Sequence, residues 1–305
     1  MKIREEFKLS QISSFLFSDL TTIITGSLST DERGNLIKSM FDCSRKKIIS
    51  IDYDIMEEKY TLDIIGDPVP PSHISKDVFL SVLKSKLSGH ERSILIDLTS
   101  LQHAVIIVLL NYLCNSIKPA HLFASYVKPE RYLERDFLGS YNISSTIFEP
   151  AGIPGIIRQQ RDNEIVIPFL GFEGARLKNI IENMSYESII PVIGFPSEDP
   201  LWQFDALRNC MQVLESSCPD ADIKKCKSNS IYDALLLLDK IEDAYPGRNL
   251  VLIPLGIRPH TAACGIWASS HKNARIVYDF AVETEKRSDG IGEITIYHLS
   301  RFIAT

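Results

Sequence analysis

The stretch NLVLIPLGIRPHTAACGIWASS, residues 249–270, joins an apolar run to a glycine turn and then to small, helix-compatible residues. An uninterrupted apolar run is typical of a strand buried on both faces, as in a parallel sheet covered by helices. Pro259 fits the first turn of a helix, where its missing N–H costs little. The stretch therefore predicts a strand–turn–helix unit of an α/β protein.

The same plan occurs earlier in the chain, in SILIDLTSLQHAVIIVLLNYL, residues 93–113. In both stretches a histidine falls five residues after a leucine, from Leu98 to His103 and from Leu255 to His260. The helix-like part of the earlier stretch is apolar nearly all round, so we expect that helix to lie buried.

A second pattern also recurs, in which a strand-like run ends in small residues and is followed by an acid and an arginine. TGSLSTDERGNLI contains Asp31 and Arg33, and LGFEGARLKNI contains Glu173 and Arg176. The order of the two patterns is the same in each half of the chain. An internal duplication explains this order, although two unrelated halves of this class would share the same strand–turn–helix punctuation.

Strands and helices alternate along most of the chain, which is the pattern of an α/β protein with mainly parallel order. The predicted strands lie at 21–26, 46–54, 60–65, 93–98, 121–127, 164–170, 188–195, 250–255, 274–280 and 293–299. The predicted helices lie at 32–43, 74–87, 101–116, 174–183, 201–216, 228–244 and 259–270. We therefore predict two fused Rossmann-like halves, 1–150 and 156–305, with mainly parallel sheets and related by a pseudo-twofold axis.

Composition excludes several classes of protein. The 305 residues are 45% hydrophobic and carry a net charge of −6, which argues against broad nucleic-acid binding. The N-terminus lacks the apolar core of a signal peptide, and the longest apolar stretch is far shorter than a membrane span. The six cysteines form no CxxC pair, so we expect reduced thiols, a cytoplasmic location and no bound metal.

The repeated turns are candidate anion sites, because ligands of open parallel sheets bind beyond the carboxyl ends of the strands. Gly26, with Ser27 beside it, and Gly256 would let the backbone approach a phosphate closely. Arg258 would add a charge-assisted contact. His260 would donate to the ligand or fix the turn; an ordinary glycine turn with Arg258 in solvent is the alternative.

In the first half, Asp97, Thr99 and His103 are the corresponding candidates. Asp97 would hold an arginine or a ribose hydroxyl. Thr99 or Ser100 would contact the ligand or cap the following helix. The acid–arginine pairs Asp31/Arg33 and Glu173/Arg176 would present an arginine to the ligand, or would form a local salt bridge at a helix start.

Motifs for cofactors and catalysis are missing. The sequence has no Walker A motif, GxGxxG, GxSxG, HExxH or kinase motif, so we expect no cofactor. Nothing supplies a nucleophile with an evident base, and the sequence leaves open whether the protein is an enzyme.

ILIDLTSLQHAVI and VLIPLGIRPHTAA each resemble the strand–turn–helix motif of CARF domains, and two such halves resemble the SAVED domains of bacterial anti-phage systems. The resemblance covers only these motifs. It implies a turn that helps to bind cyclic oligonucleotides. Gln102 stands where the first motif would have a basic residue, so we expect that half to bind weakly or to serve as scaffold.

Together these features predict a nucleotide- or phosphate-sensing regulatory protein of prokaryotic defence, which binds an anionic ligand between its halves. It would act on a separate effector or as a homo-oligomer. The alternatives are a nucleotide or phosphate-ester hydrolase of the ring-nuclease kind, and an assembly subunit that has lost its ligand.

Overall fold

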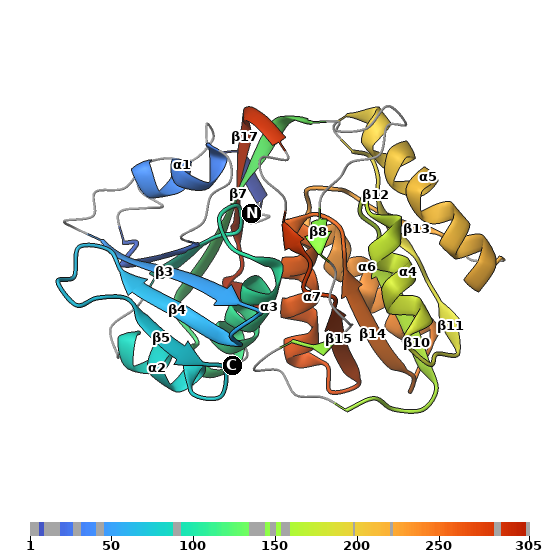
Figure 1. The fold of residues 1–305 in the computed structure, drawn as a ribbon, viewed down its shortest axis with the longest axis horizontal. Helices are drawn as coiled ribbons and strands as arrows, with labels where there is room; N and C mark the ends of the chain where they lie inside the picture. Colours follow the sequence, from blue (N-terminus) through green and yellow to red (C-terminus); the bar gives the residue numbers. More distant parts are fainter. Residues whose placement is uncertain are drawn as a thin grey trace. The chain divides into compact units, whose positions relative to one another are not determined.

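A computed structural model describes residues 6–8, 19–26, 32–40, 46–87, 93–133, 144–146, 151–153, 159–197, 199–219, 222–283 and 288–302. The chain divides into two compact units (Figure 1). The first unit is Met1–Tyr132 together with Ser288–Thr305, and the second is Leu133–Arg287. Both units are α/β in class. Within the described ranges, no helix has the length and apolar character needed to cross a membrane.

The first unit is built on a mixed sheet whose central four strands are parallel. Antiparallel strands extend it on both sides. In spatial order the strands are β1 (Glu6–Lys8), β17 (Ser288–His298), β7 (His121–Tyr132), β6 (Ser93–Asp97), β2 (Thr22–Thr25), β3 (Lys47–Asp54), β4 (Lys59–Ile64) and β5 (Ser72–Ser75).

The helices of the first unit are α1 (Arg33–Met40), α2 (Phe79–Lys86) and α3 (His103–Tyr112), and α3 continues into a π-helical turn, Leu113–Ile117. The first eight residues of α3 are all buried, which confirms the expectation from its apolar sequence. This helix packs against β3 (Figure 1). On the sheet face that carries α1, a cluster of buried residues includes Ile23, Ile37 and Leu95.

The second unit has a parallel sheet with antiparallel β9 (Ala151–Gly152) at one edge and β11 (Ser188–Ile189) paired to β10. The main strands, in spatial order, are β13 (Lys224–Cys226), β12 (Val192–Gly194), β10 (Glu164–Phe169), β14 (Asn249–Pro254) and β15 (Ala274–Tyr278). Every residue of β10 is buried, as a strand covered on both faces requires. A separate two-stranded ribbon pairs β8 (Ser144–Thr146) with β16 (Val282–Glu283).

Four helices connect the main strands of the second unit: α4 (Gly174–Glu182), α5 (Pro200–Ser217), α6 (Ile231–Ala244) and α7 (Arg258–Ser270). The crossovers run from β10 toward β13 and then back past β10 toward β15. Because such crossovers are right-handed, α4 and α5 cover one face of the sheet and α6 and α7 cover the other. Figure 1 shows α4 and α5 side by side.

Each predicted strand and helix overlaps an element of the structure, although the strand predicted at 188–195 is divided into β11 and β12. The short strands β1, β5, β8, β9, β13 and β16 were not predicted. The helix predicted from residue 74 begins at Phe79, and its first residues belong to β5. The fold class is therefore α/β, with mixed order in the first unit and parallel order in the main strands of the second.

The C-terminal segment lies outside the half to which the sequence assigned it. The predicted half 156–305 includes this segment, whereas β17 pairs antiparallel with β7 from Ser288↔Tyr132 to His298↔Phe123 in the first unit. Its apolar pattern suits either sheet, so the pattern alone does not select the partner strand. Long-range hydrogen bonding between the two strands decides the assignment.

Candidate functional site

The predicted turns lie at the carboxyl ends of parallel strands, and glycines let these turns pack against each other. A Cβ atom on Gly26, which follows β2, would lie 2.0 Å from the Ser100 carbonyl oxygen after β6. A Cβ atom on Gly171, which follows β10, would lie 2.1 Å from the Leu255 carbonyl oxygen after β14. The sequence analysis missed Gly171, and both glycines are required by contacts within the chain itself.

Close packing against the chain also explains the glycine at position 256. A Cβ atom on this residue would lie 3.1 Å from the Leu170 carbonyl oxygen. The Gly26 N–H donates to the Ser100 Oγ at 2.9 Å. Close approach of the backbone to a phosphate at either glycine stays a prediction, and Ser27 lies outside the described residues.

The two arginines of the predicted acid–arginine pairs, Arg33 and Arg176, are buried inside their units. Arg33, the first residue of α1, donates to the Val127 carbonyl at 3.0 Å and to the Ser288 Oγ at 2.8 Å. Each side chain contacts groups of its own unit, so a ligand would compete with these contacts. Asp31, the predicted partner of Arg33, lies outside the described residues.

Arg176 lies in the first turn of α4 and forms a buried ion pair. Its Nε donates to both carboxylate oxygens of Asp279, at 2.8 and 3.0 Å, and its Nη2 also contacts this carboxylate. Its Nη1 donates to the Glu173 Oε2 at 3.2 Å, which is the local salt bridge considered from the sequence. Asp279 is fully buried, and nothing in the sequence pattern indicated this partner.

Asp97 ends β6 and is fully buried. Its Oδ1 accepts from the Thr99 N–H at 3.1 Å and from the Ser125 Oγ at 3.4 Å. Burial raises the pKa of Asp97 to about 6, and hydrogen bonds from Ser100, Thr99 and Ser125 oppose the shift. No described residue bonds to its Oδ2. The turn therefore holds the Asp97 side chain through Oδ1, while Oδ2 has no hydrogen-bond partner among the described residues.

The expected helix cap by Thr99 or Ser100 is wrong. The helix α3 begins at His103, and its N-cap residue is Gln102, which makes no side-chain cap bond. The Thr99 Oγ1 instead accepts from the Val127 N–H at 2.8 Å. The reason is the length of the turn, because residues 98–102 separate strand and helix and carry Thr99 and Ser100 too far from the helix start.

The turn before α7 is shorter, with residues 255–257 between strand and helix. Arg258 is therefore the first residue of α7 and His260 the third, whereas His103 is the first residue of α3. The equal leucine-to-histidine spacing in the sequence does not give the two histidines equal helical positions.

His260 is buried and fixes the turn. Its Nε2 lies 3.2 Å from the Lys227 carbonyl oxygen and 3.5 Å from the Cys226 Sγ. Burial lowers the pKa of His260 to about 4, so the ring is neutral at pH 7. Arg258 is half-buried and stands at the helix start, as a ligand contact would require.

The helices of the second unit differ in how their N-termini are satisfied. Asp199 caps α5 by accepting from the Leu201 N–H at 2.9 Å, and Ser230 caps α6 by accepting from the Asp233 N–H at 3.0 Å. Neither α4 nor α7 has a side-chain cap bond. The two uncapped helices follow the adjacent strands β10 and β14.

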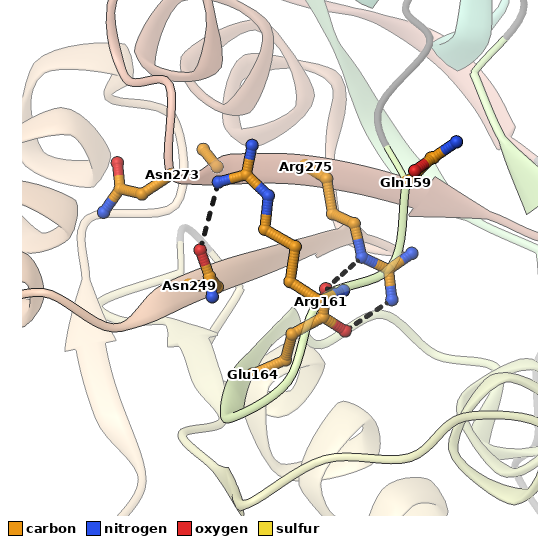
Figure 2. Close-up of a pocket in the computed structure, with 7 residues that line it drawn as sticks. Gln159, Arg161, Glu164, Asn249, Asn273 and Arg275 are labelled. Carbon is orange, nitrogen blue, oxygen red and sulfur yellow. Dashed lines mark hydrogen bonds and ion pairs between the residues drawn. The ribbon is translucent and has the colours of Figure 1, made fainter.

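A small pocket lies at the opposite end of the same strands (Figure 2). Its volume of about 10 Å³ holds one water molecule. It is lined by Gln159, Arg161, Glu164, Asn249, Asn273, Ala274 and Arg275. The sequence analysis missed this site, although polar residues at the starts of three buried strands were a readable signal.

Metal-binding groups are not gathered at either end of the strands. In the ranges that the structure describes, no three His, Cys, Asp or Glu side chains are placed to hold a metal ion. Cys210 and Cys226, which are evenly spaced with Cys218 in the sequence, are buried free thiols. Burial raises the pKa of each to about 12, so both are protonated at neutral pH.

Comparison with known proteins adds no family assignment, because no protein-family model matches the chain and no curated protein matches it significantly.

Proposed function

We propose that the protein binds a phosphate-containing, nucleotide-like ligand at the N-terminus of α7 and acts as a sensing or regulatory protein. The observation that carries the proposal is Arg258 at the first position of a 13-residue helix that has no side-chain cap. Such a terminus offers N–H donors and a partial positive charge. Arg258 adds a side chain that stays charged and fits a phosphate with two donors.

The place of α7 in the sheet supports the same site. From β10 the chain runs first to β12 on one side, and β14 later takes the other side, so the strand order reverses between β10 and β14. Open parallel sheets bind ligands beyond the carboxyl ends of the strands at such a reversal. Both helices that begin there, α4 and α7, are uncapped.

Two Rossmann-like units that arose by internal duplication are part of this proposal. Three correspondences support it. The first parallel strand of each unit lies between two others: β2 lies between β3 and β6, and β10 lies between β12 and β14. Gly26 and Gly171 make the same close backbone approach after these strands. Arg33 and Arg176 both reach from the first helix to the strand beyond β6 or β14, because Arg33 bonds to Val127 in β7 and Arg176 bonds to Asp279 just after β15.

The resemblance of the strand–turn–helix motifs to CARF and SAVED domains extends the proposal to a role in prokaryotic defence, with a separate effector protein or a second copy of the chain as partner. In the structure these motifs are β6–α3 and β14–α7. The ligand class that the resemblance implies is a cyclic oligonucleotide, which the charge of Arg258 suits.

A second candidate is an assembly subunit without a ligand. It is favoured by the internal contacts of three predicted site residues, because Arg33, Arg176 and His260 all bond within their units. A neutral, buried His260 is a structural residue rather than a contact for an anion.

Binding measurements on the purified protein separate these candidates. Wild type and Arg258→Ala are titrated with a panel of cyclic oligonucleotides, mononucleotides and inorganic phosphate. Loss of a charged hydrogen bond of about 1.5–3 kcal/mol predicts about ten- to hundredfold weaker binding in Arg258→Ala. The control is Arg248→Ala, which removes a half-exposed arginine that pairs with Glu187 in the same unit and leaves α7 intact.

Each outcome decides between the candidates. Binding without conversion, lost in Arg258→Ala alone, supports the sensor; conversion of the ligand supports the hydrolase. If the wild type binds none of these ligands, or if Arg258→Ala binds as tightly as the wild type, the proposed site at α7 is wrong. A large drop in the melting temperature of Arg258→Ala would make the arginine a structural residue.

A further inference from the structure

The pocket at the amino end of the second unit's sheet is separate from the α7 site, because it lies at the other end of the same strands. Glu164 and Asn249 are the first residues of β10 and β14, and these two residues lie opposite each other in the sheet. Arg275 is the second residue of the neighbouring strand β15. Arg161 reaches the pocket from the segment that leads into β10 (Figure 2).

The single carboxylate of the pocket, Glu164, is fully used by its neighbours. Its Oε1 accepts from the Arg275 Nε at 2.6 Å and from the Arg161 backbone N–H at 3.1 Å. Its Oε2 accepts from the Arg275 Nη2 at 2.6 Å. Glu164 is only 1% exposed, so this paired carboxylate neutralises one arginine and leaves the pocket with a net positive charge.

The remaining positive charge belongs to Arg161. Its Nη1 donates to the Asn249 Oδ1 at 3.2 Å, which holds the guanidinium beside the pocket. Among the described residues, no carboxylate pairs with this guanidinium, and the side chain is exposed. The Nη1 of Arg275 is also left outside the two-point contact with Glu164. The pocket therefore has more hydrogen-bond donors than acceptors.

The two asparagine carboxamides beside the arginines increase this excess of donors only slightly, because both already donate hydrogen bonds. The Asn249 Nδ2 donates to the Asp162 carbonyl at 3.1 Å, and the Asn273 Nδ2 donates to the Arg248 carbonyl at 3.0 Å. These bonds fix the floor of the pocket. The arginines are thus the groups that would recognise a ligand.

We propose that this pocket is a second binding site, which takes one oxygen of a small oxyanion, a phosphate or a carboxylate group, between Arg161 and Arg275. The volume of about 10 Å³ admits one oxygen-sized group, and the rest of the anion stays at the mouth. The planar fork of a guanidinium matches both kinds of oxyanion. Nothing in this proposal depends on ligand binding at α7.

The test titrates the full chain with inorganic phosphate and, separately, with acetate at constant ionic strength, and follows the backbone amide signals of residues 161–164 by NMR. We expect saturable shifts in the wild type and about tenfold weaker binding in Arg161→Gln, which loses a charged donor. Arg161→Lys keeps the charge and loses the fork, so it should bind with intermediate affinity. Arg208→Gln is the matched control, because Arg208 lies on α5 away from the pocket residues and is an exposed arginine that pairs with Asp205.

The result distinguishes this site from the α7 site. Arg258→Ala should bind phosphate at residues 161–164 as the wild type does, whatever happens to binding at α7. A preference for phosphate over acetate would identify the phosphate group as the natural occupant, and the reverse would identify a carboxylate. The proposal is overturned if neither anion shifts these signals saturably, or if Arg161→Gln binds with unchanged affinity.

Discussion

At the carboxyl ends of their parallel strands, the two sheets have the same kind of strand–turn–helix connection but different charged side chains. In the first unit a turn of residues 98–102 buries the carboxylate of Asp97, and in the second a turn of 255–257 places Arg258 at the start of a helix. The arginine of the first helix bonds to a carbonyl and a hydroxyl in one unit and to a buried carboxylate in the other. Similar strand–turn–helix connections therefore surround side chains of different charge in the two units.

The largest loss of stability is expected when one of the two buried arginines is replaced. Arg176→Ala leaves the fully buried Asp279 carboxylate without its partner, which should cost about 3–5 kcal/mol of stability. Arg33→Ala removes bonds to the Val127 carbonyl and the Ser288 hydroxyl, and should cost about 1–3 kcal/mol. Urea unfolding of both variants measures the difference.

A double variant checks the cause. Arg176→Met combined with Asp279→Leu removes both charges together, so it should recover most of the stability that Arg176→Ala loses. Recovery of little or no stability in the double variant would show that the buried charge of Asp279 does not set the cost of Arg176→Ala.

The two units should respond to pH in opposite directions. Asp97 has a folded pKa of about 6, above its ordinary 3.8, so the stability it contributes is present at low pH and is lost as the pH rises through 6. His260 has a folded pKa of about 4, below its ordinary 6.5, so its contribution is present above 6.5 and is lost as the pH falls through 4. Each difference of about two pKa units is worth about 3 kcal/mol.

The free energy of unfolding, measured between pH 4 and pH 7, tests whether the two contributions have opposite pH dependence. The wild type should change little overall, because the two terms oppose each other. Asp97→Asn should become steadily more stable as the pH rises, and His260→Gln steadily less stable. Identical pH profiles for the two variants would contradict the pKa directions.

The smallest effect is expected at Gln102. Its carboxamide accepts from the Tyr53 N–H at 2.7 Å and donates to the Tyr53 carbonyl at 3.0 Å. The paired stretch of β2 and β3 ends at Ser50, so this side chain takes the place of a strand partner. Gln102→Ala should therefore cost about 1–2 kcal/mol of stability. Gln160→Ala, which loses one exposed hydrogen bond of 3.5 Å, should leave the stability unchanged. Thermal melting of both variants measures the difference.

Much of the candidate site could be located from the sequence, whereas the roles of its residues could not. The turns at Gly26 and Gly256 were placed at the ends of strands because apolar runs and glycines are local signals. The engagement of Arg176 depends on Asp279, which lies 103 residues away in the chain. No local pattern reports such a partner. The polar residues that line the pocket of Arg161 and Arg275 were visible at the starts of three strands, but only the strand pairing shows that they meet at one place.

The sequence by itself determined the α/β class and the order of the longer strands and of the helices, because hydrophobic periodicity and turn residues act over a few neighbouring positions. Only the tertiary structure decided that β17 pairs with β7 in the first unit, and that Asp97 is fully buried with one oxygen lacking a described partner. Strand partners and burial depend on contacts between distant segments, which similar local sequences can make in more than one way.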